Sequence, residues 1–192
     1  MAVYAPSEDS LFLMKKMEKH IQKHRPKTVL DVGTGSGILA KRARELLPQA
    51  RVFATDIGKD AIRYAKESAS GVRFILSDML SGVRGRFGLI VFNPPYLPAH
   101  IYDKDPTTTG GPLGCETANR FIRQLPEHLA PGGRCLLLIS SQTNPGRIEP
   151  SLEKGGFGFE VVGSMKLFFE TLYVYSIYLR LPSASSHMVW ST

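Results

Sequence analysis

The sequence predicts an α/β fold with a mostly parallel sheet of seven strands, helices on both faces and an antiparallel hairpin at the end. Two observations lead to this class. Short apolar runs alternate with helical patterns over most of the chain, which is typical of βαβ units. The last two strand-like segments, 157–169 and 171–180, are joined by almost nothing, so we expect them to pair as a hairpin.

The expected elements follow one another in order. The chain opens with an amphipathic helix at 8–24, in which apolar residues occupy one side and lysines another. Strands are expected near 28–32, 51–55, 72–76, 87–92 and 134–140, and helices near 37–47, 59–69 and 117–129. The turn Pro131-Gly132-Gly133 should close the last of these helices. A chain of 192 residues with 43% hydrophobic content predicts one domain, 1–182, followed by a loose tail, 183–192.

Composition narrows the class of protein. The net charge is +7, and much of the positive charge lies on the first helix and just after it. This basic face either approaches RNA, a ribonucleoprotein or an acidic protein, or is simply a solvated helix face. Two cysteines and five histidines show no spacing typical of a metal site or a catalytic triad, so no metal is expected. Without an apolar stretch of about 20 residues or a signal-peptide pattern, we expect a cytoplasmic protein and no membrane partner.

A glycine-rich turn follows the first expected strand. Glycines stand at alternate positions, Gly33, Gly35 and Gly37, after Asp31 at the end of the apolar run. This spacing lets a strand turn sharply into a helix while the backbone approaches a ligand. Ile38 stands where a dinucleotide fingerprint needs glycine, and no Gly-Lys-Ser/Thr follows, so a P-loop is also absent. The plain alternative is a tight turn without a ligand.

A second turn, Asn93-Pro94-Pro95-Tyr96, follows the strand expected at 87–92. It therefore lies where a parallel sheet presents its carboxyl ends. The two prolines remove two backbone donors and stiffen the turn, so its carbonyl groups point outward. Asn93 adds a side-chain acceptor and Tyr96 an aromatic face, which together can hold a planar –NH2 group such as that of an amide or an amino-purine.

Acidic residues end the next two strands. Asp56 lies at the right distance along the chain to hold ribose hydroxyl groups, and Asp78 is placed to approach the amino group of an adenine. The glycine-rich turn and the two acidic residues together resemble the S-adenosylmethionine site of class I methyltransferases, whose Rossmann-like fold also ends in an antiparallel hairpin. This cofactor carries no phosphate, which suits a loop without basic residues. The resemblance implies that the cofactor contacts Asp31, Gly33, Thr34, Gly35, Gly37, Asp56, Ile57, Asp78, Met79 and Asn93.

The opening of the chain narrows the resemblance. Residues 3–11 read Val-Tyr-Ala-Pro-Ser-Glu-Asp-Ser-Leu, which is similar to the opening of release-factor glutamine methyltransferases of the archaeal and eukaryotic HemK-like branch. The resemblance extends to Gly110-Gly111 before Glu116, and to the terminal Phe-Phe-Glu-Thr-Leu at 168–172. Cys115 departs from this family, which commonly has arginine there. The resemblance implies that the substrate contacts Glu8, Asp9 and Pro95.

The implied substrate is the glutamine of a Gly-Gly-Gln tripeptide in a class 1 translation termination factor. In this interpretation the catalytic residues are Asn93, Pro94 and Tyr96. Asn93 Oδ1 and the Pro94 carbonyl accept the two N–H bonds of the glutamine amide, and Tyr96 packs against its plane. Relatives of this branch often work with a small zinc-binding activator protein, so a heterodimer with such a partner is implied.

Two alternatives stay open at this point. The Asn-Pro-Pro-Tyr turn is shared with methyltransferases that act on the exocyclic amine of adenine or guanine, and the charge of +7 favours an RNA or DNA substrate. The lack of an inserted recognition module and the opening string argue against it. A binding module that keeps the cofactor pocket without catalysis is the other alternative. The segment 97–114 is either a lid or wall of the substrate site, or a surface loop.

Overall fold

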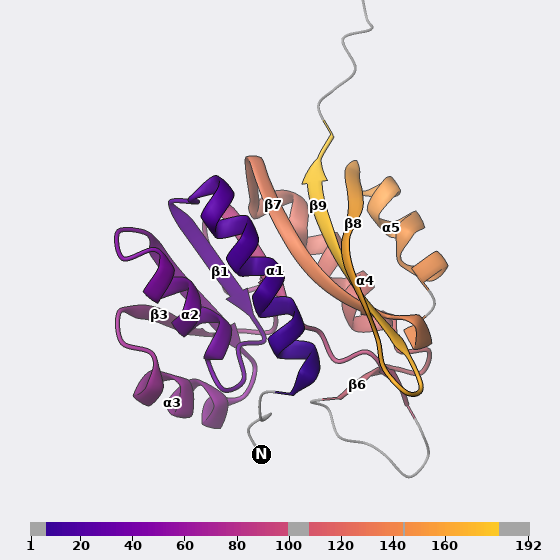
Figure 1. Ribbon diagram of the computed structural model, residues 1–192, viewed down its shortest axis with the longest axis horizontal. Coiled ribbons are helices and arrows are strands. Elements are labelled where there is room, and N and C mark those ends of the chain that lie inside the picture. Colours follow the sequence, from indigo (N-terminus) through magenta and orange to yellow (C-terminus); the bar gives the residue numbers. More distant parts are fainter. Residues whose placement is uncertain (1–6, 100–107, 144, 181–192) are drawn as a thin grey trace, which may run out of the picture.

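A computed structural model describes residues 7–99, 108–143 and 145–180, and its core is one twisted seven-stranded sheet (Figure 1). The strands lie in the order β3-β2-β1-β4-β7-β9-β8. Their bounds are β1 Thr28–Val32, β2 Arg51–Asp56, β3 Val72–Leu76, β4 Phe87–Phe92, β7 Leu129–Ser140, β8 Phe157–Lys166 and β9 Thr171–Leu179. A separate two-stranded pair joins β5, Leu97–Pro98, to β6, Thr109–Gly111.

Strand direction confirms the expected class. Strands β1 to β4 and β7 pair in parallel, whereas β9 pairs antiparallel with both β7 and β8. Only β9 is therefore reversed within the sheet, and β8 and β9 form the expected terminal hairpin. The carboxyl ends of β1, β2, β3 and β4 meet at one edge of the sheet. The tip of the β8–β9 hairpin lies at that same edge, because β8 runs in the direction of β7 (Figure 1).

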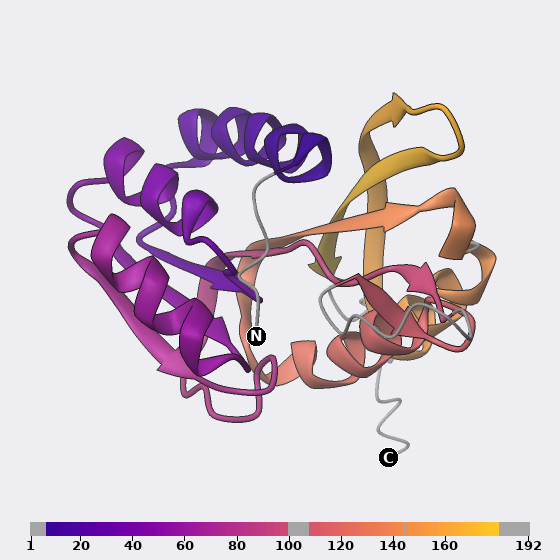
Figure 2. The same ribbon diagram turned by 90° about the horizontal axis from the view of Figure 1, so that it is seen from below.

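Helices cover both faces of the sheet, as Figure 2 shows from below. On one face lie α1, Glu8–His24, and α2, Ile38–Leu46, while α3, Lys59–Ser68, packs against β2 and β3. On the other face lie α4, Glu116–Gln124, and α5, Glu149–Lys154, with short 3-10 turns at 125–127, 141–143 and 145–147. In α1, Leu13, Met17 and Ile21 recur every four residues, so they share the face that is buried against the sheet.

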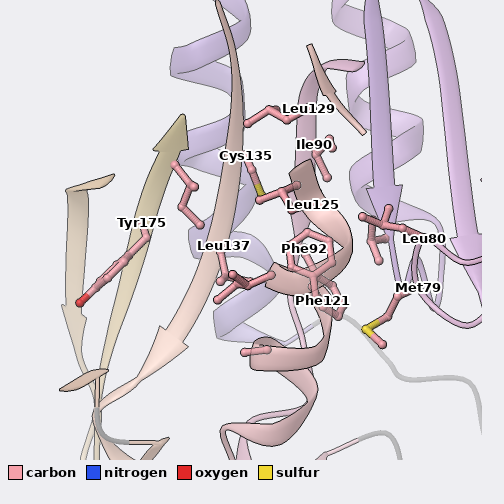
Figure 3. Close-up of a cluster of buried hydrophobic side chains, with 14 of the residues drawn as sticks. Met79, Leu80, Ile90, Phe92, Phe121, Leu125, Leu129, Cys135, Leu137 and Tyr175 are labelled. Atoms are coloured by element: carbon pink, nitrogen blue, oxygen red, sulfur yellow. The ribbon is translucent and has the colours of Figure 1, made fainter. Parts of the chain in front are cut away.

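The apolar core beneath α4 supports the edge at which the strands end (Figure 3). The Phe92 ring, from the last residue of β4, lies 4.7 Å from the Phe121 ring of α4. Leu125, Leu129 and Leu137 are fully buried around this pair. The Asn93–Tyr96 turn, which follows β4, is therefore anchored to a tightly packed part of the core. No helix among the described residues is long and apolar enough to cross a membrane.

The structure corrects several expected bounds. The helix expected at 117–129 ends at Gln124, and Pro131-Gly132-Gly133 does not close it, because β7 begins at Leu129 and includes these residues. The pairing of β4 with β7 shifts register between Phe87 and Leu89, and this irregularity accommodates the Pro-Gly-Gly step. The strand expected at 157–169 ends at Lys166. Helix α5 and strands β5 and β6 were not predicted, and the tail expected at 183–192 lies outside the described residues.

Candidate methyltransferase active site

The glycine-rich turn links β1 to α2 at the carboxyl edge of the sheet. Gly33, Gly35 and Gly37 all have positive φ, at 62°, 52° and 82°. A side chain at Gly37 would also place its Cβ 2.8 Å from the Ala65 Cβ of α3. The sequence therefore needs glycine here for backbone conformation and for helix packing together. The turn presents its backbone, without any basic side chain, to the space above the sheet.

Asp31 lies beneath this turn and is almost fully buried. Its Oδ2 atom accepts hydrogen bonds from Thr34 Oγ1 at 2.6 Å and from the Ala40 N–H at 3.1 Å, which ties β1 to the turn and to α2. Its Oδ1 atom is buried and has no partner among the described residues. Burial raises the pKa of Asp31 to about 7, although the two hydrogen bonds oppose this effect; the negative charge of Asp56 adds to it.

Asp56, at the end of β2, faces the same turn. Its two carboxylate oxygens accept hydrogen bonds from the Gly35 N–H at 2.9 Å and from the Gly58 N–H at 2.8 Å. These contacts fix the carboxylate at the rim of the turn, where it can still accept further hydrogen bonds. Ile57, which follows it, is 70% exposed and offers an apolar surface beside the carboxylate.

Asp78 follows β3 and forms an ion pair with Arg120 of α4. The two guanidinium nitrogens lie 3.1 Å from the two carboxylate oxygens, in the bidentate geometry that orients a carboxylate most strictly. Met79 has a positive φ of 49°, so the chain turns sharply after Asp78. The sequence indicated Asp78 but not Arg120, because their pairing depends on how α4 packs.

Asn93 begins the turn that leaves β4. Its Nδ2 atom donates a hydrogen bond to Ser10 Oγ of α1 at 3.3 Å. Its Oδ1 atom is buried and accepts no hydrogen bond from any described residue. Tyr96 ends the turn, and its hydroxyl group donates to Asp9 Oδ2 at 3.4 Å. Residues more than 80 positions apart in the chain therefore meet here.

The segment after this turn returns to pack directly on it. Strand β5 pairs with β6, and the Gly110 backbone lies so close to the turn that a Cβ there would be 2.5 Å from the Pro95 carbonyl oxygen. The Glu116 carboxylate accepts a hydrogen bond from the Leu113 N–H at 3.1 Å and so joins this segment to α4. The described ends of the segment 97–114 thus form a wall of the site. Residues 100–107 lie outside the described part of the chain.

A cavity of about 390 Å³ joins these features. Most of the expected site residues line it: Asp9, Gly33, Thr34, Gly35, Asp56, Ile57, Asp78, Met79, Asn93, Pro94, Pro95 and Tyr96. Asp31 and Gly37 support the turn from behind instead, and Glu8 is exposed at the start of α1 outside the cavity lining. Thr108 and Thr109 also line it, and they belong to the segment 97–114 that was a candidate lid or wall. The sequence did not single out the other polar lining residues, which are Ser10, Ser36, Ser77, Thr117 and Arg120. Ser10 is the one of these that the sequence could have indicated, because it directly follows the pair Glu8-Asp9.

Cys115 is buried among apolar side chains and is not part of the cavity lining. The departure from the usual family residue at this position therefore lies in the core of the structure. Over the described ranges, no group of three or more His, Cys, Asp or Glu side chains is arranged to hold a metal ion.

Comparison with known proteins identifies the family of the chain. The model of the methyltransferase small domain matches residues 7–160. The chain belongs to this family. A Methanocaldococcus jannaschii protein, provisionally named a protein N5-glutamine methyltransferase, is 34% identical over 185 residues, which cover 90% of this chain and 89% of that protein. Mouse methyltransferase HEMK2 is 29% identical over 169 residues, covering 80% and 79% of the two chains.

A solved structure shows the same architecture. The Mtq2 chain of the E. cuniculi Mtq2–Trm112 complex, described as responsible for methylation of the translation termination factor eRF1, matches with a TM-score of 0.76 and 29% identity. The match covers 94% of this chain and all of that chain. The Rossmann-like methyltransferase fold and the resemblance to HemK-like glutamine methyltransferases, both predicted from the sequence, are confirmed.

Proposed function

We propose that this methyltransferase transfers a methyl group from S-adenosylmethionine to the side-chain amide nitrogen of a glutamine in a class 1 translation termination factor. One observation carries the proposal: the Asn93 Oδ1 atom is buried and unpartnered among the described residues, in a residue that lines the cavity. A buried acceptor without a donor costs about 1–3 kcal/mol, which a substrate N–H group can recover. The names of the relatives support a glutamine amide as the group that supplies it.

The residues of the cavity fit S-adenosylmethionine. Arg120 is the only cationic side chain among the described lining residues, and it is paired with Asp78. A phosphate-bearing cofactor would therefore find no free cation, whereas a cofactor with a positive sulfur and an ammonium group suits an acidic site. Asp56 and Asp78 supply acceptors for ribose hydroxyls and for the adenine amino group. The cavity volume of about 390 Å³ lies within the usual range of small-molecule sites, roughly 300–1,000 Å³.

The catalytic turn is suited to activate an amide. When bound, S-adenosylmethionine would supply an electrophilic methyl group on a positively charged sulfur, which keeps the electron pair of the broken S–C bond and leaves as a neutral thioether. An amide nitrogen is a poor nucleophile because its lone pair is delocalised into the carbonyl group. Asn93 Oδ1 and the Pro94 carbonyl would accept the two N–H bonds, oppose this delocalisation and aim the nitrogen at the methyl carbon. Tyr96 would pack against the amide plane.

No dedicated base is needed in this mechanism. As the new N–C bond forms, the amide nitrogen becomes strongly acidic, and its proton can pass to water. Orientation of the reacting atoms is the main contribution of the protein, and such positioning can supply roughly 7–11 kcal/mol of the barrier. The proposed roles of Asn93, Pro94 and Tyr96 are therefore sufficient without an ionisable side chain beside the reacting nitrogen.

The edge of the sheet that carries the site also presents apolar groups suited to a protein substrate. At the tip of the β8–β9 hairpin, Phe168 and Phe169 are 92% and 84% exposed, and their rings pack edge to face with centroids 4.6 Å apart. The hairpin is held to the end of β7, because Glu170 accepts a hydrogen bond from Ser140. Exposed aromatic groups on a rigid support are typical of protein-binding surfaces. We expect Phe168→Ala with Phe169→Ala to raise KM for the release factor and leave binding of S-adenosylhomocysteine unchanged.

An activator subunit is the second proposed partner. Strand β3 is an edge of the sheet, with no strand on its outer side among the described residues, and Leu76 at its end is 49% exposed. Tyr64 of α3, which packs against this strand, is 52% exposed. An added strand from a small partner protein would pair this edge and cover these groups. The E. cuniculi relative is part of a two-protein complex, which supports the proposal; that the partner binds zinc rests on the family resemblance alone.

Methylation of an exocyclic base amine is the second candidate function. The net charge of +7 favours it, and the lysine-rich side of α1 would supply the contacts to phosphates. A base amine would use the same two acceptors as a glutamine amide. We expect this candidate to fail, because the M. jannaschii relative is named for glutamine methylation and the E. cuniculi complex is described as methylating a termination factor.

A transfer assay tests the proposal. The protein, alone and with a zinc-binding activator, is incubated with labelled S-adenosylmethionine and either release factor or total RNA. Label on the release factor, lost when its Gly-Gly-Gln glutamine is replaced, supports the proposed function. Label on RNA alone would move the proposed function to a base amine.

An enzyme acting on termination factors would work in the cytoplasm, so we expect a tagged copy to fractionate with cytosolic proteins.

A further inference from the structure

Positive charge gathers at the edge of the sheet opposite the cavity. The parallel strands begin at this edge, β9 ends there, and α1 reaches it with its last turn (Figure 1). Five neighbouring strands each carry one cationic side chain at or near this end, in the order β2, β1, β4, β7 and β9. These five side chains, called the basic edge below, are Arg51, Lys27, Arg86, Arg134 and Arg180.

Acidic neighbours do not neutralise the basic edge. The ion pairs of the described ranges lie on α1 and α2, on α3, and between β3 and α4, and none of them includes a side chain of the basic edge. Lys27, Arg51 and Arg180 are exposed, and among the described residues their side chains form no hydrogen bond. Glu127, in the 3-10 turn before β7, adds one negative charge to this region, against five positive charges.

Two guanidinium groups of the basic edge are held in place. Arg86 Nη1 donates hydrogen bonds to the Pro126 carbonyl at 2.9 Å and to the Leu129 carbonyl at 2.8 Å. The Arg134 guanidinium lies over the Tyr178 ring, 4.5 Å from its centroid. A guanidinium has five N–H donors, so both groups keep donors for a ligand. Because their side chains are already fixed, they lose less conformational entropy when they bind an anion.

Helix α1 extends this positive surface. Its exposed lysines recur every four residues along one face: Lys15, Lys19 and Lys23. Near the end of the helix, His20 stacks on His24 with ring centroids 4.5 Å apart. Burial lowers the pKa of His20 to about 4, and the positive charges of His24, Arg134 and Lys23 lower it further. The helix dipole explains cations in the last turn of α1, but not those at the starts of the strands.

We propose that the basic edge binds the phosphate backbone of an RNA and thereby docks the enzyme on a ribonucleoprotein. Neighbouring strands lie about 4.8 Å apart, so a row across five strands spans roughly 19 Å. One strand of a nucleic acid carries a phosphate about every 3.4 Å of helix axis, so this row can face about five or six phosphates. RNA is chosen over DNA because a translation factor works among ribonucleoproteins, and this choice rests on the proposed function.

Docking at the basic edge leaves the cavity free. Arg86 and Asn93 flank the two ends of β4, whose six residues separate them by roughly 20 Å at about 3.3 Å per residue. An RNA bound along the basic edge is therefore remote from the Asn93 acceptor. The positive charge of the chain thus favours RNA as a docking partner without making it the methyl acceptor.

The test compares two triple variants of the full chain with its activator. Each lowers the net charge from +7 to +1 by replacing three exposed cations with glutamate. The first changes the basic edge: Lys27→Glu, Arg51→Glu and Arg180→Glu. The control changes α2, the start of α3 and the end of β8, which lie toward the cavity: Lys41→Glu, Lys59→Glu and Lys166→Glu. The probe is a fluorescently labelled single-stranded RNA of about 20 nucleotides, longer than the row.

The Kd of this RNA is measured by fluorescence anisotropy at several salt concentrations. At about 0.15 M salt, charges more than about 8 Å from the RNA are largely screened. We therefore expect the basic-edge variant to raise the Kd at least tenfold and the control variant to raise it less than about threefold. Each phosphate contact contributes about 0.7 to the slope of log Kd against log salt, so the loss of three contacts should lower this slope by about 2.

Four results would overturn the proposal: no saturable RNA binding by the parent at about 0.05 M salt, equal weakening in the two variants, tighter binding of duplex DNA, or tighter binding of polyglutamate with the same number of charges. Methyl label on this RNA after incubation with labelled S-adenosylmethionine would also overturn it, because the RNA would then be a substrate. The Kd of S-adenosylhomocysteine and the midpoint of thermal unfolding show whether each variant is folded.

Single variants keep the test decisive if the basic-edge triple variant does not fold. Lys27→Glu, Arg51→Glu and Arg180→Glu should each lower the salt slope by about 0.7, and a parental slope in all three would overturn the proposal. If the parent methylates no release factor but binds the RNA through the basic edge, the proposed function fails and the docking surface stands.

Discussion

Replacing Asn93 with alanine removes the side-chain acceptor assigned to the substrate amide. The Oδ1 atom is buried and has no partner among the described residues, so nothing else in the described site takes over its role. The Pro94 carbonyl belongs to the backbone and remains, so one of two proposed acceptors is lost. Removal of one preorganised hydrogen-bonding group from an active site typically lowers kcat by about 10²–10³, or about 2.7–4 kcal/mol. We expect a loss of this size for Asn93→Ala.

Asn119 offers a matched control for this substitution. Its Oδ1 atom is also buried without a partner among the described residues, and its Nδ2 atom donates to the Arg147 carbonyl at 3.2 Å. It is not part of the cavity lining. Asn119→Ala therefore removes the same chemical group in a similar setting away from the proposed chemistry. We expect it to alter stability by about 1 kcal/mol, as expected for one lost hydrogen bond, and to leave kcat nearly unchanged.

The assay separates chemistry from binding. Initial rates of methyl transfer to the release factor give kcat and KM, and calorimetry gives the Kd of S-adenosylhomocysteine. In Asn93→Ala, kcat should fall while that Kd changes by less than about threefold. Parental kcat in this variant, or an equal fall in Asn119→Ala, would refute the reasoning that assigns Asn93 to the substrate amide.

Three further predictions concern the cofactor turn and its support. Asp56→Ala, which removes the acceptor of the Gly35 and Gly58 N–H groups, should raise the Kd of S-adenosylhomocysteine at least tenfold by calorimetry; an unchanged Kd would contradict the ribose assignment. Gly37→Ala should lower the unfolding free energy by about 1–3 kcal/mol more than Gly132→Ala. Both glycines have positive φ, but only Gly37 lies against α3, so equal losses of unfolding free energy in chemical denaturation would contradict this. Burial raises the pKa of Asp31 from its ordinary 3.8 to about 7, so its contribution to stability is complete below about pH 4 and is lost as pH rises through 7. Asp31→Asn should flatten this part of the stability profile, and an identical slope in both proteins would show that another group titrates.

The order of strands and helices was largely predictable from the sequence, because the pattern of apolar residues is local. Strands β1 to β4 follow apolar runs, and the burial of Leu13, Met17 and Ile21 follows from their helical spacing. Pro131-Gly132-Gly133 misled the prediction because such a step normally ends an element. Here a register shift against β4 lets β7 continue through it, and no local pattern shows which strand will lie alongside.

The same difference between local and distant contacts limits prediction of the site. The glycine turn, the two strand-end carboxylates and the Asn93–Tyr96 turn are short motifs, and the structure brings them to one cavity. Arg120 was missed because its pairing with Asp78 joins positions 42 residues apart, and Ser10 because its contact with Asn93 spans 83. Glu8, which the resemblance places against the substrate, is exposed and lies outside the cavity lining, whereas Asp9 and Ser10 of the same turn are buried.

The most direct test of the account is mass spectrometry of the release factor after incubation with the protein, its activator and S-adenosylmethionine. The account predicts a mass increase of one methyl group on the peptide that contains Gly-Gly-Gln, located on the glutamine side chain. That increase should be absent when Asn93→Ala replaces the parent enzyme over the same interval. An unmodified Gly-Gly-Gln peptide, with methyl groups instead on RNA bases, would contradict the central claim that the Asn93 turn holds a glutamine amide.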